Sequence, residues 1–200
     1  VKNSIDDAAE LKRLLKGSGV LEFHILVEDY SSAEARMMIQ RLNKSGPVVQ
    51  SGDTMKWFQI DHPEDWKQAK YNYNDKFYAL AYITPGKSMV NGPGIMRWSL
   101  QKAYPTMDST GGQAVGFEFE PVGAGYFSDL TSANINHPLA SILDERIITA
   151  PNINSRIGAS GIITGNFSND ELRYMISTLN AGSLPAQLGE TQNQIARAIL

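Results

Sequence analysis

The stretch FSNDELRYMISTLNAG, Phe167–Gly182, carries the clearest fold signal in the chain. Ser168 stands where a helix N-cap belongs, and Glu171 three residues later completes a capping box. The apolar residues that follow recur at helical spacing and form one stripe, which consists of Leu172, Met175, Ile176 and Leu179. Gly182 stands where a helix ends on a left-handed residue. The spacing therefore predicts an amphipathic helix that packs through this stripe against the rest of the fold.

Outward from this helix, apolar and polar side chains alternate in several segments, as they do in half-buried strands. Over 20–27, Leu21, Phe23 and Ile25 point one way and His24 points the other. Further strands are expected over 77–84, 114–120, 139–143, 146–149 and 161–165, of which the third and fourth form a hairpin.

Helices and strands together predict the fold class. Further helices are expected over 4–16, from Ser31 or Ser32 to Lys44, over 95–104, and from Pro121 to about Thr131. Ser31 forms a second capping-box pair with Glu34, and the segment 48–75 is expected to hold short strands and one short helix. Because there is no regular βαβ alternation, the sequence predicts an α+β fold, a two-layer mixed α/β sandwich. The side chains expected in its core are Leu21, Phe23, Ile25, Val115, Phe117, Phe119, Ile142, Leu143, Leu172, Met175, Ile176 and Leu179.

The composition excludes several classes of protein. The chain has 200 residues, a net charge of -3 and no cysteine, so it contains neither disulfides nor thiolate metal sites. Its lysines and arginines form no cluster, and we therefore expect no nucleic-acid partner. No apolar run approaches the roughly 18 residues of a membrane helix, and at this length one domain, or one domain with a lobe, is expected.

The residues that usually carry chemistry are few. The histidines are His24, His62 and His137, and none stands at a metal-ligand spacing from another. The glycine-rich runs 86–94 and 122–125 lack the other residues of a phosphate or dinucleotide loop, and there is no Gly-x-Ser-x-Gly elbow. We therefore expect no catalytic residue, no metal and no cofactor, and the protein is predicted not to be an enzyme.

Aromatic residues gather among polar ones before the middle of the chain. They are Trp57, Phe58, Trp66, Tyr71 and Tyr73. Aromatic side chains anchor many interfaces, so these residues are candidates for contact with a polypeptide. They also suit the core of a lobe, and the sequence leaves both interpretations open.

The second half of the chain carries an ordered series of motifs. They are GAGYFSDLT (123–131), LASILD (139–144), IITAPNI (147–153), IITGNFS (162–168) and LNAGSLPAQL (179–188), with LEF (21–23) upstream. In this order they resemble the first large periplasmic domain of the SecD family of protein-export membrane proteins. The resemblance is close over 114–188 and partial over 1–28. It departs at Glu145, where the family usually has glycine, at His24, where it usually has arginine, and over 189–200.

The resemblance implies a division of the chain into a ferredoxin-like base near the membrane and a protruding head. Residues 1–28 would belong to the base, 29–180 would form the head, and 181–200 would return to the base. The crossings between head and base supply the hinge candidates, which are Glu28, Ser31, Ala181, Gly182, Ser183 and Leu184. Motion at these few residues would let the head swing without unfolding.

The leading functional hypothesis follows from the resemblance. The chain would be a domain of a translocase subunit that assists protein export driven by the proton motive force. It would contact the emerging unfolded polypeptide and move between conformations at the periplasmic, extracytoplasmic face of the bacterial inner membrane. The parent would be a multi-pass membrane protein, with SecF and the SecYEG channel as partners.

Two other hypotheses belong to different functional classes. A secreted α+β hydrolase would use His62 or His137, and it requires a deep pocket that holds a histidine beside a carboxylate with a shifted pKa. A static scaffold would bind only other translocon subunits. A broad apolar cleft would instead favour polypeptide capture.

Overall fold

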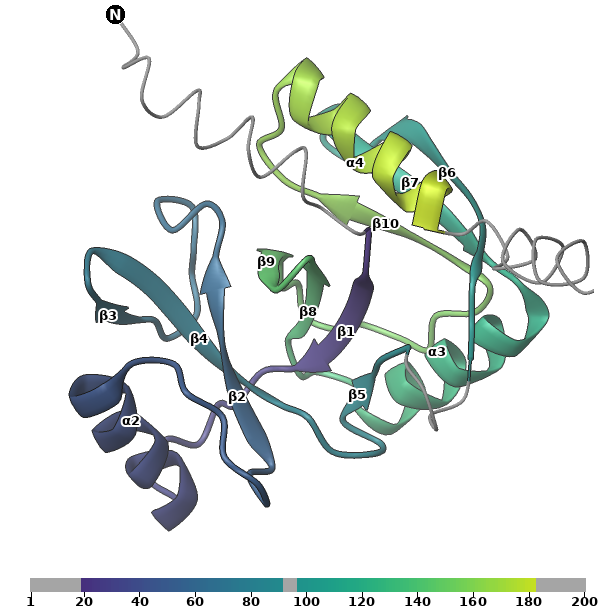
Figure 1. The fold of residues 1–200 in the computed structure, drawn as a ribbon. Helices are drawn as coiled ribbons and strands as arrows, with labels where there is room; N and C mark the ends of the chain where they lie inside the picture. Colours follow the sequence, from purple (N-terminus) through teal and green to yellow (C-terminus); the bar gives the residue numbers. More distant parts are fainter. Residues whose placement is uncertain (1–18, 92–96, 183–200) are drawn as a thin grey trace, which may run out of the picture.

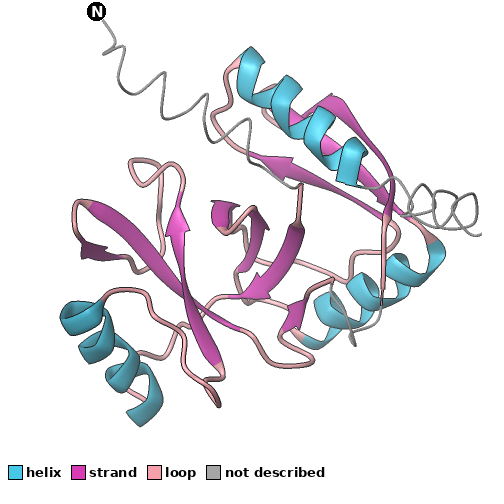
Figure 2. Ribbon diagram, viewed as in Figure 1, coloured by secondary structure: helices cyan, strands magenta, loops and turns pink. Residues whose placement is uncertain are grey.

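A computed structural model describes residues 19–91 and 97–182, which form the sheets and helices drawn in Figure 1 and Figure 2. The predicted helix over 4–16, the segment 189–200, Ser183 and Leu184 lie outside these residues. Helices combine with one mixed and one antiparallel sheet, which confirms the α+β class.

The larger sheet has seven strands in the order β3-β4-β2-β9-β8-β1-β5. Their bounds are Tyr71–Tyr73 (β3), Lys76–Tyr82 (β4), Met55–Ile60 (β2), Arg146–Thr149 (β9), Leu139–Leu143 (β8), Leu21–Ile25 (β1) and Ser88–Met89 (β5). In this sheet β2 and β9 run parallel, and the other neighbours are antiparallel.

This sheet curls back on itself. After β1 the chain returns to β4, where Val27 N donates to Leu80 O at 2.9 Å and Leu26 forms an antiparallel bridge with Ala81. A nearly closed ring is therefore formed by strands β4, β2, β9, β8 and β1. It closes where the residues just after β1 meet β4, and it is called the ring below.

The smaller sheet has three antiparallel strands in the order β10-β7-β6, with bounds Ser160–Thr164, Gln113–Phe119 and Leu100–Met107. The helices are α2 (Ala33–Ser45), α3 (Pro121–Ala133) and α4 (Asn169–Gly182). In Figure 1, α4 lies across β6 and β7, α3 lies near β5, and α2 lies at the opposite end of the molecule beside β2 and β4. The smaller sheet, α3 and α4 thus form one layer over the β1 side of the larger sheet.

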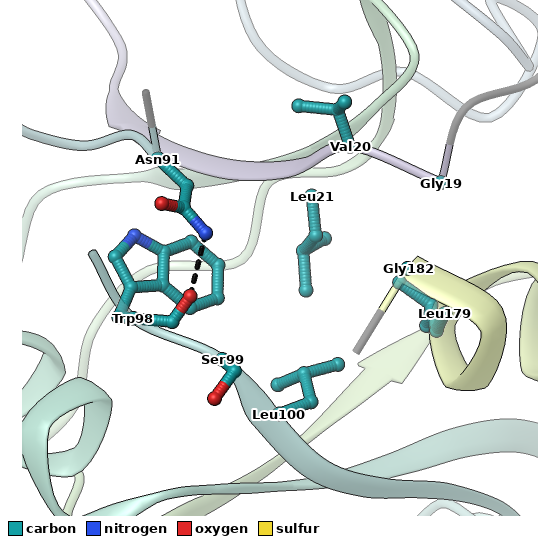
Figure 3. A pocket seen from close by; sticks show the side chains of 9 residues that line it. All are labelled: Gly19, Val20, Leu21, Asn91, Trp98, Ser99, Leu100, Leu179 and Gly182. Atoms are coloured by element: carbon teal, nitrogen blue, oxygen red, sulfur yellow. Dashed lines mark hydrogen bonds between the residues drawn. The ribbon is translucent and has the colours of Figure 1, made fainter. Parts of the chain in front are cut away.

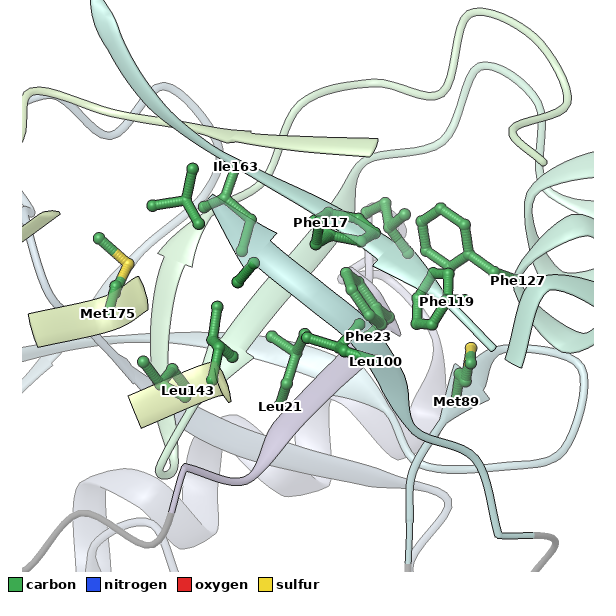
Figure 4. Close-up of a cluster of buried hydrophobic side chains, with 14 of the residues drawn as sticks. Leu21, Phe23, Met89, Leu100, Phe117, Phe119, Phe127, Leu143, Ile163 and Met175 are labelled. Carbon is green, nitrogen blue, oxygen red and sulfur yellow. The ribbon is translucent and has the colours of Figure 1, made fainter. Parts of the chain in front are cut away.

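The main core lies between these two layers, with Phe23 of β1 at its centre (Figure 4). Phe23 is 1% exposed, and its ring centroid lies 4.7 Å from that of Phe127 in α3. The centroids of Phe117 and Phe119 in β7 are 5.7 Å and 5.9 Å away. Met175 of α4 belongs to the same buried cluster. Strand β1, both helices and the smaller sheet therefore share one core.

Two further cores lie on the two faces of β2 and β4. On one face, α2 buries its apolar stripe, which consists of Ala35, Met38 and Leu42, against Trp57 and Leu80. On the other face, inside the ring, the buried side chains are Leu26, Phe58, Ile60, Ala79, Ala81, Ala140, Ile142, Ile147 and Ala150. The small alanine side chains suit the narrow interior of a curled sheet.

Several elements confirm the sequence predictions. Strands β8 and β9 have the predicted bounds, and the hairpin turns at Asp144 and Glu145, whose φ angles of 49° and 69° are both positive. Helix α3 begins at Pro121. The capping box of α4 is present, since Glu171 N donates to Ser168 Oγ at 3.3 Å and Ser168 N donates to Glu171 Oε2 at 2.7 Å.

Two predicted helices are wrong. A helix was expected over 95–104, but the described residues of this range lead into β6 and form its start. A bulge between Leu100 and Lys102 interrupts the alternation that marks a strand, and for this reason the sequence did not indicate β6. The short helix expected within 48–75 is absent, since the residues between β2 and β3 form turns.

Two smaller predictions also need correction. The N-cap of α2 is Ser32, whose hydroxyl accepts from Ala35 N at 3.2 Å, whereas Ser31 hydrogen-bonds to Asp29. The predicted core side chains are buried except Ile176, which is half-buried at the edge of the main core.

His24 does not lie on a solvated face of β1. It is 1% exposed, because β1 is an interior strand that is covered on both faces. Its Nδ1 lies 2.8 Å from Tyr82 O, and its ring centroid lies 4.9 Å from that of Phe58. The alternation of apolar and polar residues therefore predicted the strand correctly, but its prediction that the His24 face of the strand is exposed to solvent is wrong.

Gly182 is the last residue of α4, and its φ is not in the left-handed region. A Cβ built on Gly182 would lie 2.9 Å from Gly19 O, which is too close for a real contact. Glycine is required here because the end of α4 packs directly against the main chain that leads into β1.

We predict that Phe23→Ala lowers the free energy of unfolding by about 3–5 kcal/mol, because it leaves a cavity at the centre of the main core. Urea unfolding followed by tryptophan fluorescence measures the loss. Val122→Ala is the matched control, since Val122 is 54% exposed, and it should change stability by less than about 0.5 kcal/mol. A loss below about 1 kcal/mol for Phe23→Ala would contradict the central position of this ring.

We also predict opposite effects for alanine at two helical glycines. Gly182→Ala should lower the melting temperature, because its Cβ would meet the main-chain oxygen of Gly19. Gly125→Ala in α3 has no neighbouring atom within 4 Å of the new Cβ, so it should stabilise by about 0.5–1 kcal/mol through helix propensity. Thermal unfolding of both variants is the measurement, and stabilisation by both would show that α4 does not pack on Gly19.

Candidate functional site

An apolar groove lies between β5 and α3. It encloses about 540 Å³ and is lined by Ile83, Met89, Val90, Trp98, Tyr126 and Leu130, among others. Among the described residues that line it, Asp129 is the one that carries a charge. Strand β5 is held in place by its pairing with β1, and α3 is held by the burial of Phe127 and Leu130 in the main core. The walls of the apolar groove are therefore attached to β1 and to the main core.

Trp98 forms one wall of the apolar groove and is 6% exposed. Its Nε1 is buried and has no hydrogen-bond partner among the described residues. The indole N–H groups of Trp57 and Trp66 differ, since they donate to the main-chain oxygens of Met38 at 3.1 Å and Ala69 at 3.3 Å. The apolar groove thus combines apolar walls with one buried donor in its lining.

Trp98 also borders a smaller pocket of about 160 Å³, which Figure 3 shows. Leu21, Leu100 and Leu179 line this pocket, and Asn91 Nδ2 donates to Trp98 O at 2.5 Å. The pocket lies where β1, β6 and α4 meet, and its lining includes Trp98, which it shares with the apolar groove, as well as Gly19 and Gly182.

A second groove of about 560 Å³, called the polar groove here, lies on another part of the surface. It is lined by His62, Trp66, Gln68, Ile148, Ala150 and Thr164, among others. Gln68 Nε2 donates to Ala150 O at 2.7 Å and fixes the loop after β2 to the end of β9. The polar groove therefore runs between this loop, β9 and the end of β10.

His62 lies at the edge of the polar groove among carboxylates. Its Nδ1 is 3.3 Å from Glu64 Oε1, and its Nε2 is 3.6 Å from Glu171 Oε1 and 3.9 Å from Asp61 Oδ2. A hydrogen bond from its own main chain, together with one from His62, lowers the pKa of Glu64. A general acid needs the opposite shift. His62 also has no hydroxyl nucleophile among its hydrogen-bond partners in the described chain.

His137 is exposed and paired with Glu28, whose Oε2 lies 2.6 Å from its Nδ1. Neither His62 nor His137 therefore has the arrangement of nucleophile, base and enclosed pocket that the hydrolase hypothesis requires, and that hypothesis is not supported. Within residues 19–91 and 97–182 no group of His, Asp and Glu side chains is placed to hold a metal ion.

The aromatic candidates are divided by the structure. Trp57 and Phe58 are 3% and 1% exposed, so they are core side chains and form no contact surface. Tyr71 and Tyr73 are half-buried against the core beneath α2, and Trp66 lines the polar groove. The core interpretation is therefore correct for the first pair.

Sequence reasoning missed the aromatic residues of the apolar groove, which are Trp98 and Tyr126. Trp98 precedes the bulged strand β6, and Tyr126 lies on α3. For Tyr126 the signal was its spacing from Leu130, four residues further on, which places both residues on one side of α3.

The hinge candidates lie in two separate places. Glu28 and Ser31 belong to the connection between β1 and α2, where Ser31 N donates to Asp29 Oδ1 at 2.9 Å. Ala181 and Gly182 end α4 beside Gly19. Both the hinge and the division into 1–28, 29–180 and 181–200 stay predictions.

The described part of the predicted base segment, residues 19–28, contains β1. This strand pairs with β5 and β8, which lie within the range predicted for the head.

No helix in the described part of the chain is both long enough and apolar enough to cross a membrane.

Comparisons with known proteins converge on one family. The model for the SecDF P1 head subdomain matches residues 84–186, more than half of the chain. The protein translocase subunit SecD of Leptotrichia buccalis is 39% identical over 190 residues, which cover 92% of this chain and 47% of that protein. SecD of Rhodobacter capsulatus is 32% identical over 183 residues, which cover 91% of this chain and 27% of that protein. The chain thus spans less than half the length of these relatives.

Solved structures agree with this assignment. A structure of SecDF, described as a membrane component that enhances protein export, matches with a TM-score of 0.50 and 26% identity over 92% of this chain and 72% of that chain. SecDF in a super-membrane-facing form matches with the same TM-score and identity, over 92% of this chain and 21% of that chain. From its motifs, its fold and these matches, the chain belongs to the SecDF family, as the first periplasmic domain of SecD with its P1 head subdomain.

Proposed function

We propose that the domain assists protein export by binding the emerging unfolded polypeptide in the apolar groove while it moves between conformations powered by the proton motive force. The observation that carries this proposal is the apolar groove itself, with about 540 Å³ of space between β5 and α3. An unfolded polypeptide exposes the apolar side chains that a folded protein buries. A groove of this size accommodates a few of them, and each buried side chain contributes about 1.5–3 kcal/mol.

The lining of the apolar groove suits clients of different sequence. Its walls include Met89, whose thioether side chain adapts to irregular surfaces. Trp98 Nε1, which is buried and has no partner among the described residues, adds one hydrogen-bond donor to this lining. A groove that selected its clients by shape alone would exclude many of the different sequences in an exported mixture.

The rest of the proposal concerns the parent protein. SecF and the SecYEG channel would be partners through the full-length chain, at the periplasmic face of the inner membrane in which the parent is embedded. The names of the relatives, which are translocase subunits, support this placement. The motion would use the hinge candidates near Glu28–Ser31 and Ala181–Leu184. The contact between Gly182 and Gly19 supports a hinge at the second of these, since it brings two ends of the described chain to one corner.

We predict that Ala133→Glu weakens binding of an unfolded polypeptide by about tenfold or more, because it buries a carboxylate against the apolar client. Ala133 is an exposed residue that lines the apolar groove. Fluorescence anisotropy with labelled, reduced and carboxymethylated α-lactalbumin, which stays unfolded, measures the affinity.

Val122→Glu is the matched control for this experiment. It places the same charge on the same helix at an exposed position outside the apolar groove, so it should bind like the unaltered chain. Equal affinities for all three proteins would remove the apolar groove as the contact. A complete absence of binding by the unaltered chain would favour the scaffold hypothesis instead.

A further inference from the structure

The two sheets have four edge strands, and three of them are protected against pairing with another chain. In the larger sheet, β3 and β5 have three and two residues. In the smaller sheet, β6 carries Lys102, Pro105 and a bulge. Short strands, lysine, proline and bulges are the usual means by which proteins keep an edge from acquiring a further strand.

The fourth edge strand, β10, lacks this protection. Its five residues, SGIIT over Ser160–Thr164, include no charged residue and no proline. In the described chain it pairs only with β7. Ile162 is 49% exposed, whereas Ile163 is buried in the main core. Its β-branched side chains favour an extended conformation. The outer edge of β10 has no partner strand in the described chain, and it is called the free edge here.

The register of β10 determines which main-chain groups point to this free edge. Phe119 N donates to Ala159 O at 2.8 Å, and Ser160 pairs with Glu118. Hydrogen-bonded and non-hydrogen-bonded pairs alternate along an antiparallel ladder. Ala159, Gly161 and Ile163 therefore bond to β7, and the N–H and C=O groups of Ser160, Ile162 and Thr164 point away from it.

Space for an additional strand exists at the end of β10. Thr164 lines the polar groove, whose opposite wall is formed by Ile148 and Ala150 at the end of β9. Trp66 stands at the rim of this groove with its indole N–H already bonded to Ala69 O. The polar groove therefore offers an aromatic surface beside the free edge.

We propose that the free edge of β10 binds an extended segment of the exported polypeptide as a fourth strand of the smaller sheet. This inference rests on the proposed function for the identity of the occupant, and it adds a second contact with a different mode of recognition. Strand addition draws its affinity from main-chain hydrogen bonds, which every polypeptide supplies. The free edge can therefore bind those stretches of a client that lie between its apolar segments and that offer the apolar groove nothing to bind.

Hydrogen exchange measured by NMR tests the proposal without any substitution. In the free chain the amides of Ile162 and Thr164 should exchange rapidly, whereas those of Gly161 and Ile163 should be protected by β7. Reduced and carboxymethylated α-lactalbumin, added until about nine-tenths of the chain is bound, should slow the first pair about tenfold. The second pair serves as the internal control and should change little.

A pair of substitutions at Ile162 provides an independent test. Ile162→Pro removes the outward N–H without removing a bond to β7, and it should weaken binding about tenfold. Ile162→Ala shortens the side chain but keeps the N–H, so it should retain the affinity within about threefold. Thermal unfolding of both variants verifies that the smaller sheet is intact.

The outcomes separate this inference from the proposed function. If the probe binds while the amides of Ile162 and Thr164 remain unprotected, strand addition is overturned and the apolar groove stands. Equal affinities of Ile162→Pro and the unaltered chain lead to the same conclusion. If the probe does not bind at all, the proposed function fails and this inference fails with it.

Discussion

The burial of β1 on both faces is the constraint on which the rest of the structure depends. One face contributes Phe23 to the core shared with the smaller sheet, α3 and α4. The other places His24 and, just after the strand, Leu26 inside the ring of the larger sheet. The same strand pairs with β5 and β8, and its continuation closes the ring at β4. The apolar groove, the smaller pocket and the position of α4 all follow from elements that β1 holds together.

A polar residue in such a strand requires a hydrogen-bond partner. His24 finds one in Tyr82 O, at 2.8 Å, on the strand that closes the ring. The imidazole thereby ties β1 to β4 from within, beside the main-chain bond between Val27 and Leu80. The imidazole of His24 packs on Phe58, at the position where the family motif usually has an arginine side chain. The departure from the family motif at this position is thus accommodated in the ring.

The sequence predicted those elements whose conformation depends on residues close together in the chain. The capping box of Ser168 and Glu171, the proline at the start of α3 and the turn at Asp144 and Glu145 each act within a few residues of the chain. The sequence could not reveal the closure of the ring, because it depends on Val27 meeting Leu80, which follows only after α2, β2 and β3 in the chain. The bulge in β6 hid a strand by breaking its alternation.

The candidate site was harder to predict than the fold for the same reason. Trp57 is buried because α2 covers it, although the polar residues Lys56 and Gln59 flank Trp57 and Phe58 in the sequence. The apolar groove is assembled from β5, Trp98 and α3, and no single segment carries its pattern. The free edge of β10 is a property of the sheet order, which a list of strands does not contain. Family resemblance identified the kind of function, whereas the surfaces that serve it required the tertiary structure.

The contact between Gly19 and Gly182 has a mechanical consequence. The described chain enters and leaves the fold at one corner, where the main chains come closer than any side chain allows. A pulling force applied between Gly19 and Gly182 would therefore act across this corner and would not cross the packed layers.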